Sequence, residues 1–218
     1  YKESYKFLKK LDGLETNHRN YSSKYLFSLI NLGKFNEAFY YSKKLEKRKL
    51  SNFESDLIIG LYYFKNEKFD LAQKYFLKLK NRKSQIIFNN FISNSLLNWS
   101  SLKTLDLNSA QKKIYEIDSK FMNLRNIQNV FLHCFYKSKK TELLFKNLVS
   151  NEKIDFSRYN YFYATYLKNV GQLQKAKKVL FLATNLSNNL SKLVPKMAVS
   201  VIEIITEIDK RQDIKIKG

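Results

Sequence analysis

His133 and Cys134 are adjacent residues whose side chains could carry out catalysis together. A thiol beside an imidazole suggests a nucleophile and its general base. On a helix, however, consecutive side chains point about 100° apart and do not face each other. No acidic residue nearby in the sequence completes a triad, and a reactive thiolate needs an electropositive setting. We therefore expect Cys134 to pack within a helix, and we predict that the chain is not an enzyme.

Residues that bind metals or cofactors are scarce or scattered. The chain has 1 cysteine and 2 histidines, too few for a zinc site or a disulfide framework. Glu203 and Glu207 lie four residues apart, but no histidine accompanies them, so a solvated helix face is expected there. The 5 glycines form neither a G-x-G-x-x-G nor a G-x-x-x-x-G-K phosphate loop. The sequence thus predicts no metal and no cofactor.

The chain is strongly basic, with 40 Lys and Arg against 19 Asp and Glu and a formal net charge of +21. Such a charge raises nucleic acid or an anionic surface as a partner. The basic residues are 34 Lys and only 6 Arg, however, alongside 22 Asn and 7 Ala, a skew typical of an AT-rich genome. Nucleic-acid sites depend on Arg for bidentate and stacking contacts. We expect a lysine-rich solvated surface, with nucleic-acid binding as an alternative.

The elements that hold these side chains are expected to be helices. The sequence has only 5 Gly and 1 Pro among 218 residues, whereas turn-rich β folds need more of both. Alternation of period two is not sustained anywhere, and apolar residues instead recur at helical spacing. No apolar stretch reaches the roughly 18 residues that a membrane-spanning helix needs. These patterns predict an all-α fold without a transmembrane segment.

A small residue recurs along the chain at a period of about 34 residues. From Ala38, the next matches are Ala72, Ala110, Leu144 and Ala176, at spacings of 34, 38, 34 and 32 residues. Each match lies in the second of two apolar helical stretches that a short polar turn separates. We expect the small residue to let the two helices approach closely, while a large residue four positions later fills the gap one turn away. These large residues are Phe76, Ile114, Leu148 and Leu180.

The pattern resembles the tetratricopeptide repeat (TPR) family, as a degenerate array of the bacterial type. Residues 157–190 match the family's motif best, and no unit has its usual tryptophan or its closing proline. The resemblance covers roughly residues 4–190 and implies a right-handed superhelical solenoid of antiparallel helix hairpins. In such a solenoid each unit is stabilised by stacking on its neighbours. The matching residues of the best unit are Ala164, Leu167, Gly171, Leu173, Ala176, Leu180 and Ala183.

This repeat divides the chain into successive segments. Residues 1–18 are expected to form the second helix of a repeat whose first helix is missing, and residues 191–218 a C-terminal capping helix and tail. Because the chain begins with Tyr1, we expect that its natural N-terminus, with any targeting signal, is missing, and a cytoplasmic location is favoured. The predicted repeats are 19–52, 53–90 with a longer loop, 91–124 and 125–156, which are degenerate, and 157–190.

The resemblance also implies which side chains face a partner. In the family, the first helices line the concave face of the solenoid, through positions three, four and three residues apart. In the later units these positions carry aromatic, basic and amide groups, which are favoured at binding hot spots. The earlier units are more apolar there, for example at Phe27 and Leu61. The predicted partner-binding residues are Trp99, Asn129, His133, Tyr136, Arg158, Tyr161 and Lys168.

The implied function is a protein–protein interaction scaffold that binds a peptide or a helix of a partner protein in the concave groove. Two alternatives remain open. One is nucleic-acid or anionic-surface binding through a ladder of lysines that share one repeat position on the convex side. The other is a docking arm of a larger enzyme. The ladder lysines are Lys74, Lys112, Lys146 and Lys178.

Overall fold

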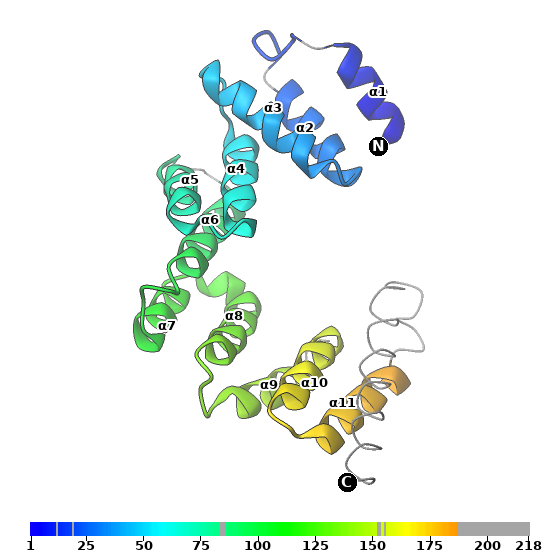
Figure 1. Cartoon of the computed structure of the whole chain (residues 1–218), viewed down its shortest axis with the longest axis vertical. Helices are drawn as coiled ribbons and strands as arrows, with labels where there is room; N and C mark the ends of the chain where they lie inside the picture. Colours follow the sequence, from blue (N-terminus) through cyan, green and yellow to red (C-terminus); the bar gives the residue numbers. More distant parts are fainter. Residues whose placement is uncertain (12, 19, 83–85, 152–153, 155, 187–218) are drawn as a thin grey trace. The chain divides into compact units, whose positions relative to one another are not determined.

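The structure is a computed structural model that describes residues 1–186, except residues 12, 19, 83–85, 152–153 and 155 (Figure 1). In the described part every regular element is helical, which confirms the all-α prediction. The predicted capping helix and tail at 191–218, with Glu203 and Glu207, lie outside the described residues. The elements are α1 (Lys2–Lys10), α2 (Tyr21–Asn31), α3 (Phe35–Lys47), α4 (Phe53–Lys65), α5 (Phe69–Asn81), α6 (Ile87–Ser100), α7 (Leu107–Tyr115), the short 3₁₀ helix η1 (Ser119–Phe121), α8 (Met122–Phe135), α9 (Thr141–Val149), η2 (Ser157–Tyr159), α10 (Asn160–Asn169) and α11 (Leu173–Leu186).

The chain divides into two compact units. Unit 1 comprises Tyr1–Phe121 and unit 2 comprises Met122–Gly218. In unit 1 each helix from α1 to α7 packs on the next one along the chain, and in unit 2 α8 packs on α9, α9 on α10 and α10 on α11. We call α2, α4, α6, α8 and α10 the first helices of their pairs, and α3, α5, α7, α9 and α11 the second helices. The repeat pattern in the sequence predicted a continuous array, with no sign of this division.

The second helices share one buried pattern. A small residue near the helix start is followed by further buried residues four and seven positions later, and all of these side chains are at most 6% exposed. Because residues four and seven positions apart lie on the same side of a helix, they form one stripe along each second helix, and in the third pair Ile117 continues the stripe two residues past the end of α7. The stripes are Ala38, Ser42 and Leu45; Ala72, Phe76 and Leu79; Ala110, Ile114 and Ile117; Thr141, Phe145 and Leu148; and Ala176 and Leu180.

The fourth stripe corrects the sequence prediction, which placed the small position at Leu144. Thr141 is fully buried, whereas Leu144 is only half-buried. The Thr141 hydroxyl donates to the carbonyl oxygen of Ser138 at 2.7 Å, so its burial leaves no unpaired donor. Threonine can therefore take the place of alanine here. The repeat pattern missed it because threonine does not stand out as a small apolar residue at a fixed period.

Two predicted repeat boundaries fall inside helices. The boundary between residues 90 and 91 lies within α6, which begins at Ile87, and the boundary between 124 and 125 lies within α8, which begins at Met122. The connection 82–86 is as long as the connection 48–52. The last residues of the predicted repeat 53–90, from Ile87 to Asn90, form the first turn of α6.

Four first helices end in the same left-handed turn. The second residue past the helix end adopts a positive φ, and the next N–H donates to a carbonyl oxygen five residues earlier, at 2.8–2.9 Å. This pairing satisfies carbonyl groups at the end of a helix and reverses the chain toward the second helix. The positive-φ residues are Gly33 (71°) after α2, Glu67 (56°) after α4, Lys137 (51°) after α8 and Gly171 (82°) after α10.

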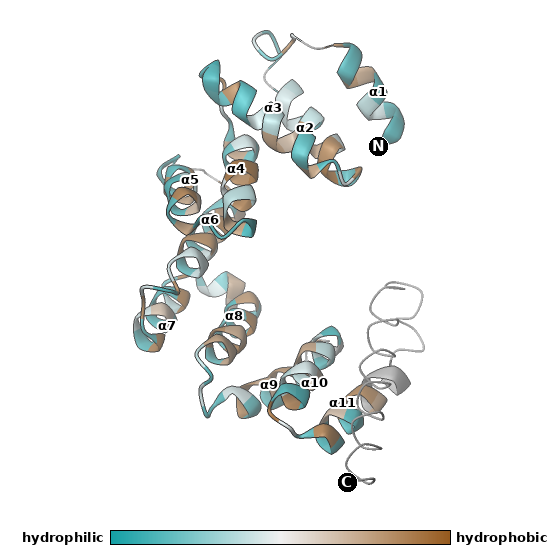
Figure 2. Cartoon of the chain, viewed as in Figure 1, coloured by the Kyte–Doolittle hydropathy of each residue, from teal (hydrophilic) through white to brown (hydrophobic). Residues whose placement is uncertain are grey.

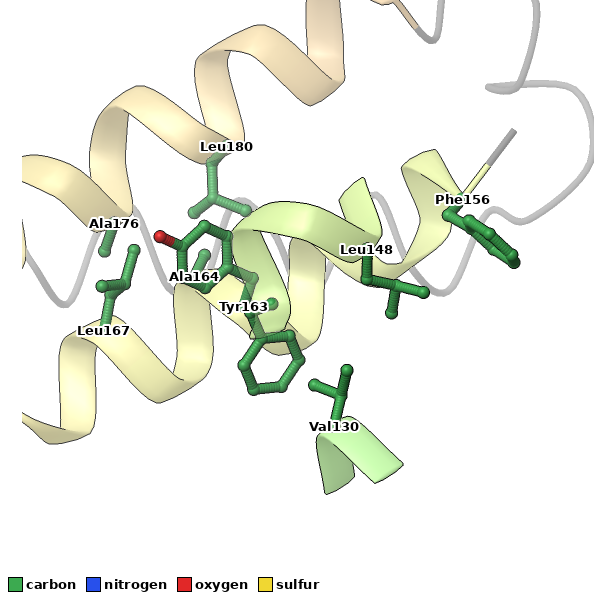
Figure 3. Close-up of a cluster of buried hydrophobic side chains, with 9 residues drawn as sticks. Val130, Leu148, Phe156, Tyr163, Ala164, Leu167, Ala176 and Leu180 are labelled. Carbon is green, nitrogen blue, oxygen red and sulfur yellow. The ribbon is translucent and has the colours of Figure 1, made fainter. Parts of the chain in front are cut away.

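The core of unit 2 shows how the stripes are covered. Ala176 and Leu180 of α11 pack with Ala164, Leu167 and Tyr163 of α10 in one buried cluster (Figure 3). The same cluster includes residues of α8 and α9. Each helix also carries hydrophilic residues beside its hydrophobic ones (Figure 2), which is typical of helices packed on one side and solvated on the other.

Unit 1 contains a network of charged side chains that joins α3, α4 and α5. The buried carboxylate of Asp56 accepts hydrogen bonds from Lys78 and from the Arg82 guanidinium, each at 2.8 Å. Glu46 pairs with Lys43 and accepts a hydrogen bond from the Tyr75 hydroxyl at 2.9 Å. These contacts cross between helices, so they fix the position of α5 against α3 and α4. They also engage Lys43 and Lys78, whose charges are thereby partly neutralised.

A first prediction concerns the contact between the helices of the second pair. A Cβ atom added at Gly60 would lie 2.5 Å from Cε1 and 2.8 Å from Cδ1 of the buried Phe76 ring. We expect Gly60→Ala to lower the free energy of unfolding by about 1–3 kcal/mol through overpacking, despite the better helix propensity of alanine. Adding Phe76→Leu should recover part of that loss. Urea unfolding of both single variants and the double variant measures these free energies. If the two single changes simply add up in the double variant, the side chains at positions 60 and 76 do not interact.

A second prediction concerns the turn after α8. Lys137 holds a left-handed conformation that favours glycine, with φ at 51°. Lys137→Gly should therefore raise the free energy of unfolding by about 0.5–1 kcal/mol. The matched control is Lys139→Gly in the same turn, since Lys139 does not have a positive φ. Thermal unfolding measures the change in stability of both variants, and equal changes at the two positions would contradict the prediction.

Candidate functional site

The seven side chains predicted to bind a partner differ in accessibility. Arg158 is exposed, whereas Asn129 and His133 are buried, with 9% and 4% of their surface exposed. The expectation that His133 would be partly exposed is therefore wrong. Trp99 lies on α6 of unit 1, and the other six residues belong to unit 2. The remaining four are half-buried: Trp99, Tyr136, Tyr161 and Lys168.

The corrected position of α9 explains why Asn129 is buried. Gly60 and Ala164 each precede the small residue of their second helix by twelve positions, and both are buried against that helix pair. Asn129 precedes Thr141 by the same twelve positions. Counting from Leu144 had placed Asn129 on the inward stripe by an error of three residues. His133 precedes Thr141 by eight positions, as Lys168 precedes Ala176, so it keeps an inward position although its side chain is buried. Neither residue therefore belongs to an accessible docking face.

One accessible face runs along α10, and we call it the α10 face. Three of its members were predicted, and they follow one side of the helix together with Thr165, at spacings of three, four and three residues. Phe162 was missed because the predicted stripe took one residue per turn, although its ring is 40% exposed. The side chain of Thr165 is held in place by donating to the carbonyl oxygen of Tyr161 at 2.8 Å. The α10 face comprises Arg158, Tyr161, Phe162, Thr165 and Lys168.

Neighbouring rings hold the aromatic part of the α10 face. The Phe162 ring meets the Phe131 ring of α8 edge to face, with centroids 5.2 Å apart, and lies 5.4 Å from the Tyr161 ring. The Arg158 guanidinium lies 5.7 Å from the centre of the Tyr159 ring. Such contacts restrict the rings and the guanidinium before any partner arrives. The face is therefore an ordered aromatic surface with a cation near each end.

Unit 1 has a corresponding surface on its first helices, which we call the α2–α4 face. Ser23 of α2 donates a hydrogen bond to Glu54 of α4 at 3.1 Å, so the two helices lie side by side there. Phe27 and Leu61 are exposed, as expected for the predicted inward positions. The Phe27 ring also meets the Tyr1 ring edge to face, at 5.6 Å. This face is more apolar than the α10 face.

The adjacent His133 and Cys134 do not have the properties of a nucleophile and its base. Burial, and to a lesser extent the charge of Lys140, lowers the pKa of His133. Burial also raises the pKa of the Cys134 thiol. Both shifts favour the neutral forms, whereas a reactive thiolate beside an imidazolium needs the charged ones. Cys134 packs against the hydrophobic core of unit 2, as the sequence predicted.

In the part of the chain that the structure describes, no three or more His, Cys, Asp or Glu side chains gather as a metal site. None of the helices described is both long and apolar enough to cross a membrane.

The predicted lysine ladder needs correction. Lys74, Lys112 and Lys178 are exposed two positions after the small residue, as predicted. Lys146 is exposed too, but it follows the small residue Thr141 by five positions. The position that Lys146 was expected to fill is occupied by Leu143 in α9. These lysines therefore do not share one repeat position.

Glu142 of α9 links the last two helix pairs. Its carboxylate accepts hydrogen bonds from the Lys175 ammonium at 2.8 Å and from the Gln172 amide at 2.9 Å. These bonds, that of Lys175 first, lower the pKa of Glu142 below its ordinary value of 4.5. The ionised carboxylate is thus favoured in the folded chain, and the linkage stabilises the fold above that value.

A third prediction follows from this pairing. Near neutral pH, wild-type protein should be more stable than Glu142→Gln by about 0.5 kcal/mol, since the pair is partly exposed. The difference should disappear as the pH falls from about 4.5 through the lower pKa of the folded state. Thermal unfolding of both proteins across this pH range is the measurement, with the exposed Glu116→Gln as control. A difference that persists in acid would contradict the assignment.

Comparison with known proteins supports the fold. No family model matches the sequence, and no curated protein matches it. The structure is similar to the crystal structure of a thermophilic TPR protein of Thermus thermophilus, with a TM-score of 0.59 and 14% sequence identity. The similarity covers 88% of this chain and 99% of that protein. The chain therefore has a TPR-like fold of consecutive helix pairs, as the repeat pattern predicted.

Proposed function

We propose that the chain is a protein-interaction scaffold that docks a peptide or a helix of a partner protein on the faces of its first helices. The TPR-like fold supports a general scaffold role, because such helix pairs present their first helices to other proteins. The observation that carries the proposal is the α10 face. There, Tyr161 and Phe162 lie accessible between two cations, Arg158 and Lys168.

The composition of the α10 face suits protein recognition. Tyrosine, phenylalanine and arginine give large contact areas at a small cost in conformational entropy. Phe162 and Tyr161 are already held by neighbouring rings, so little further order is lost when a partner binds. An apolar or aromatic side chain of the partner is the natural complement of this centre.

The two cations define the charge of the partner. Arg158 lies in η2, directly before α10, and Lys168 lies ten residues later in α10, a separation of roughly 15 Å at a rise of about 1.5 Å per residue. A partner helix would span that distance with about ten residues, and an extended peptide with about five. The proposed partner segment therefore carries carboxylates at both ends and an apolar centre. Arginine can bind one of these carboxylates in a bidentate manner.

The α2–α4 face is a second place for the same function in unit 1. Phe27 and Leu61 supply apolar contact, and Glu54 supplies a carboxylate already paired with Ser23. In α2 the positions that correspond to Arg158 and Lys168 are held by Asn20 and Ile30, which carry no charge. We therefore propose that any segment bound there is more apolar and less acidic. Catalysis is not part of the proposal, since the one adjacent histidine and cysteine favour their neutral forms.

A fourth prediction tests the α10 face directly. Peptides selected from a random display library against the whole chain should carry acidic residues around an apolar or aromatic centre. The double variant Phe162→Ala with Arg158→Ala should bind these peptides at least about tenfold more weakly, because both anchors are truncated. Isothermal titration measures the affinity, and thermal unfolding checks that the variant remains folded.

The matched control is Phe35→Ala with Lys47→Ala, which removes an exposed aromatic ring and an exposed cation from the second helix α3 instead. It should leave the affinity for the selected peptides unchanged. If the α10 double variant binds them as tightly as the wild-type chain, the α10 face is not the docking site.

A further inference from the structure

The outward side of the second helices repeats a pairing of one lysine with one large apolar side chain. The pairing becomes visible once positions are counted from the small buried residue of each helix, with Thr141 in α9. Two and five positions after that residue, every second helix has one lysine and one large apolar residue. The pairs are Tyr40 and Lys43, Lys74 and Leu77, Lys112 and Tyr115, Leu143 and Lys146, and Lys178 and Phe181.

The apolar members of these pairs are well exposed. Their side chains have between 50% and 67% of their surface accessible. Single exposed apolar residues are ordinary on protein surfaces. Here they recur at a fixed distance from the buried stripe, and each lies one helical turn from a lysine. Each unit therefore has an amphipathic outward surface of its own, on α3, α5 and α7 in unit 1 and on α9 and α11 in unit 2.

Most of the lysines in these pairs are accessible. Lys43 is engaged by Glu46 and by the Tyr75 hydroxyl, so it contributes little free charge. The other four lysines are exposed. In α11 the sequence Leu173–Leu186 contains no acidic residue, so Lys178 lies in a uniformly basic or neutral helix. The positive charge is thus carried on the same surface as the exposed rings and leucines.

We propose that the outward surface of each unit binds an anionic lipid surface. The lysine ammonium groups would contact the headgroup phosphates and carboxylates, and each such lysine adds to the attraction. The tyrosine, phenylalanine and leucine side chains would enter the boundary between headgroups and acyl chains. The net charge of +21 complements such a surface.

The apolar residues favour lipid over nucleic acid as the occupant. Proteins bind nucleic acids through arginine side chains and through aromatic rings that stack on the bases. Leu77 and Leu143 offer no ring for stacking, yet they take the same place as the rings of Tyr115 and Phe181. Transfer of an aliphatic side chain from water into hydrocarbon is favourable, whereas placing it beside a phosphate backbone provides little stabilisation. This surface lies on the second helices, so the inference does not depend on the docking faces of the first helices.

Sedimentation with lipid vesicles tests the inference at near-physiological salt. The full chain should bind vesicles that contain about one third phosphatidylserine and should not bind vesicles of phosphatidylcholine alone. Lys74→Gln, Lys112→Gln and Lys178→Gln together should weaken binding at least about tenfold, through loss of charge. Leu77→Ser, Leu143→Ser and Phe181→Ser together should weaken it at least about tenfold at unchanged net charge.

The matched control is Lys24→Gln with Phe27→Ser, a lysine and an exposed ring three residues apart on the first helix α2. It should bind phosphatidylserine vesicles as the wild-type chain does. Circular dichroism melting identifies any variant that has lost its fold, and single substitutions then replace the triple one.

Three results would overturn the inference. The first is equal binding of wild-type protein to both kinds of vesicle, or to neither. The second is an apolar triple variant that binds phosphatidylserine vesicles as tightly as wild type, which would indicate non-specific charge attraction alone. The third is binding of the wild-type chain to an oligouridylate that displaces it from the vesicles, if the apolar triple variant binds the oligouridylate equally well. That result would indicate nucleic acid as the ligand.

Discussion

The close approach of the two helices in each pair is the contact on which the rest of this structure depends. It requires a small residue near the start of the second helix and a large buried residue four positions later, as with Ala72 and Phe76. In the second pair, the large ring leaves no space for a Cβ atom at Gly60 of the first helix. Because protein interiors are close-packed, such a contact fixes the rotation of one helix on the other. The rotation in turn decides which side of each helix meets solvent.

Both proposed binding surfaces are consequences of that rotation. With the buried stripe fixed, the residues two and five positions after the small residue point outward, and the free side of the first helix carries Phe27 in α2 and Phe162 in α10. Unlike the buried stripe, these positions keep much of each side chain exposed to solvent, so their composition can serve binding. Charged residues near the core have a different role, because Asp56 and Glu142 are paired across helices and stabilise the arrangement.

The fold could be predicted from sequence because close packing leaves a periodic signal in residue size, and alanine at four of five small positions made that signal clear. The docking residues were harder to predict, because solvent-facing positions show no periodic signal in residue size. Their positions were counted from the small residue, so an error in that residue shifts all of them. One error at Leu144 moved the α8 stripe by three residues and placed buried Asn129 on the surface. The hydroxyl of Thr141 concealed the correct position, because its pairing with Ser138 becomes visible only in three dimensions. Phe162 had a usable signal, as the neighbour of Tyr161 on the same helix face.

Amide hydrogen exchange along the whole chain tests most directly whether one small buried position organises every pair, including the fourth. The account predicts that amides of residues 141–148 in α9 exchange as slowly as those of residues 72–79 in α5, since both stripes are buried to a similar extent. The turn at 136–140 should exchange much faster than either. Exchange at 141–148 as fast as in that turn would contradict the account, because α9 would then not be packed through Thr141 and Phe145.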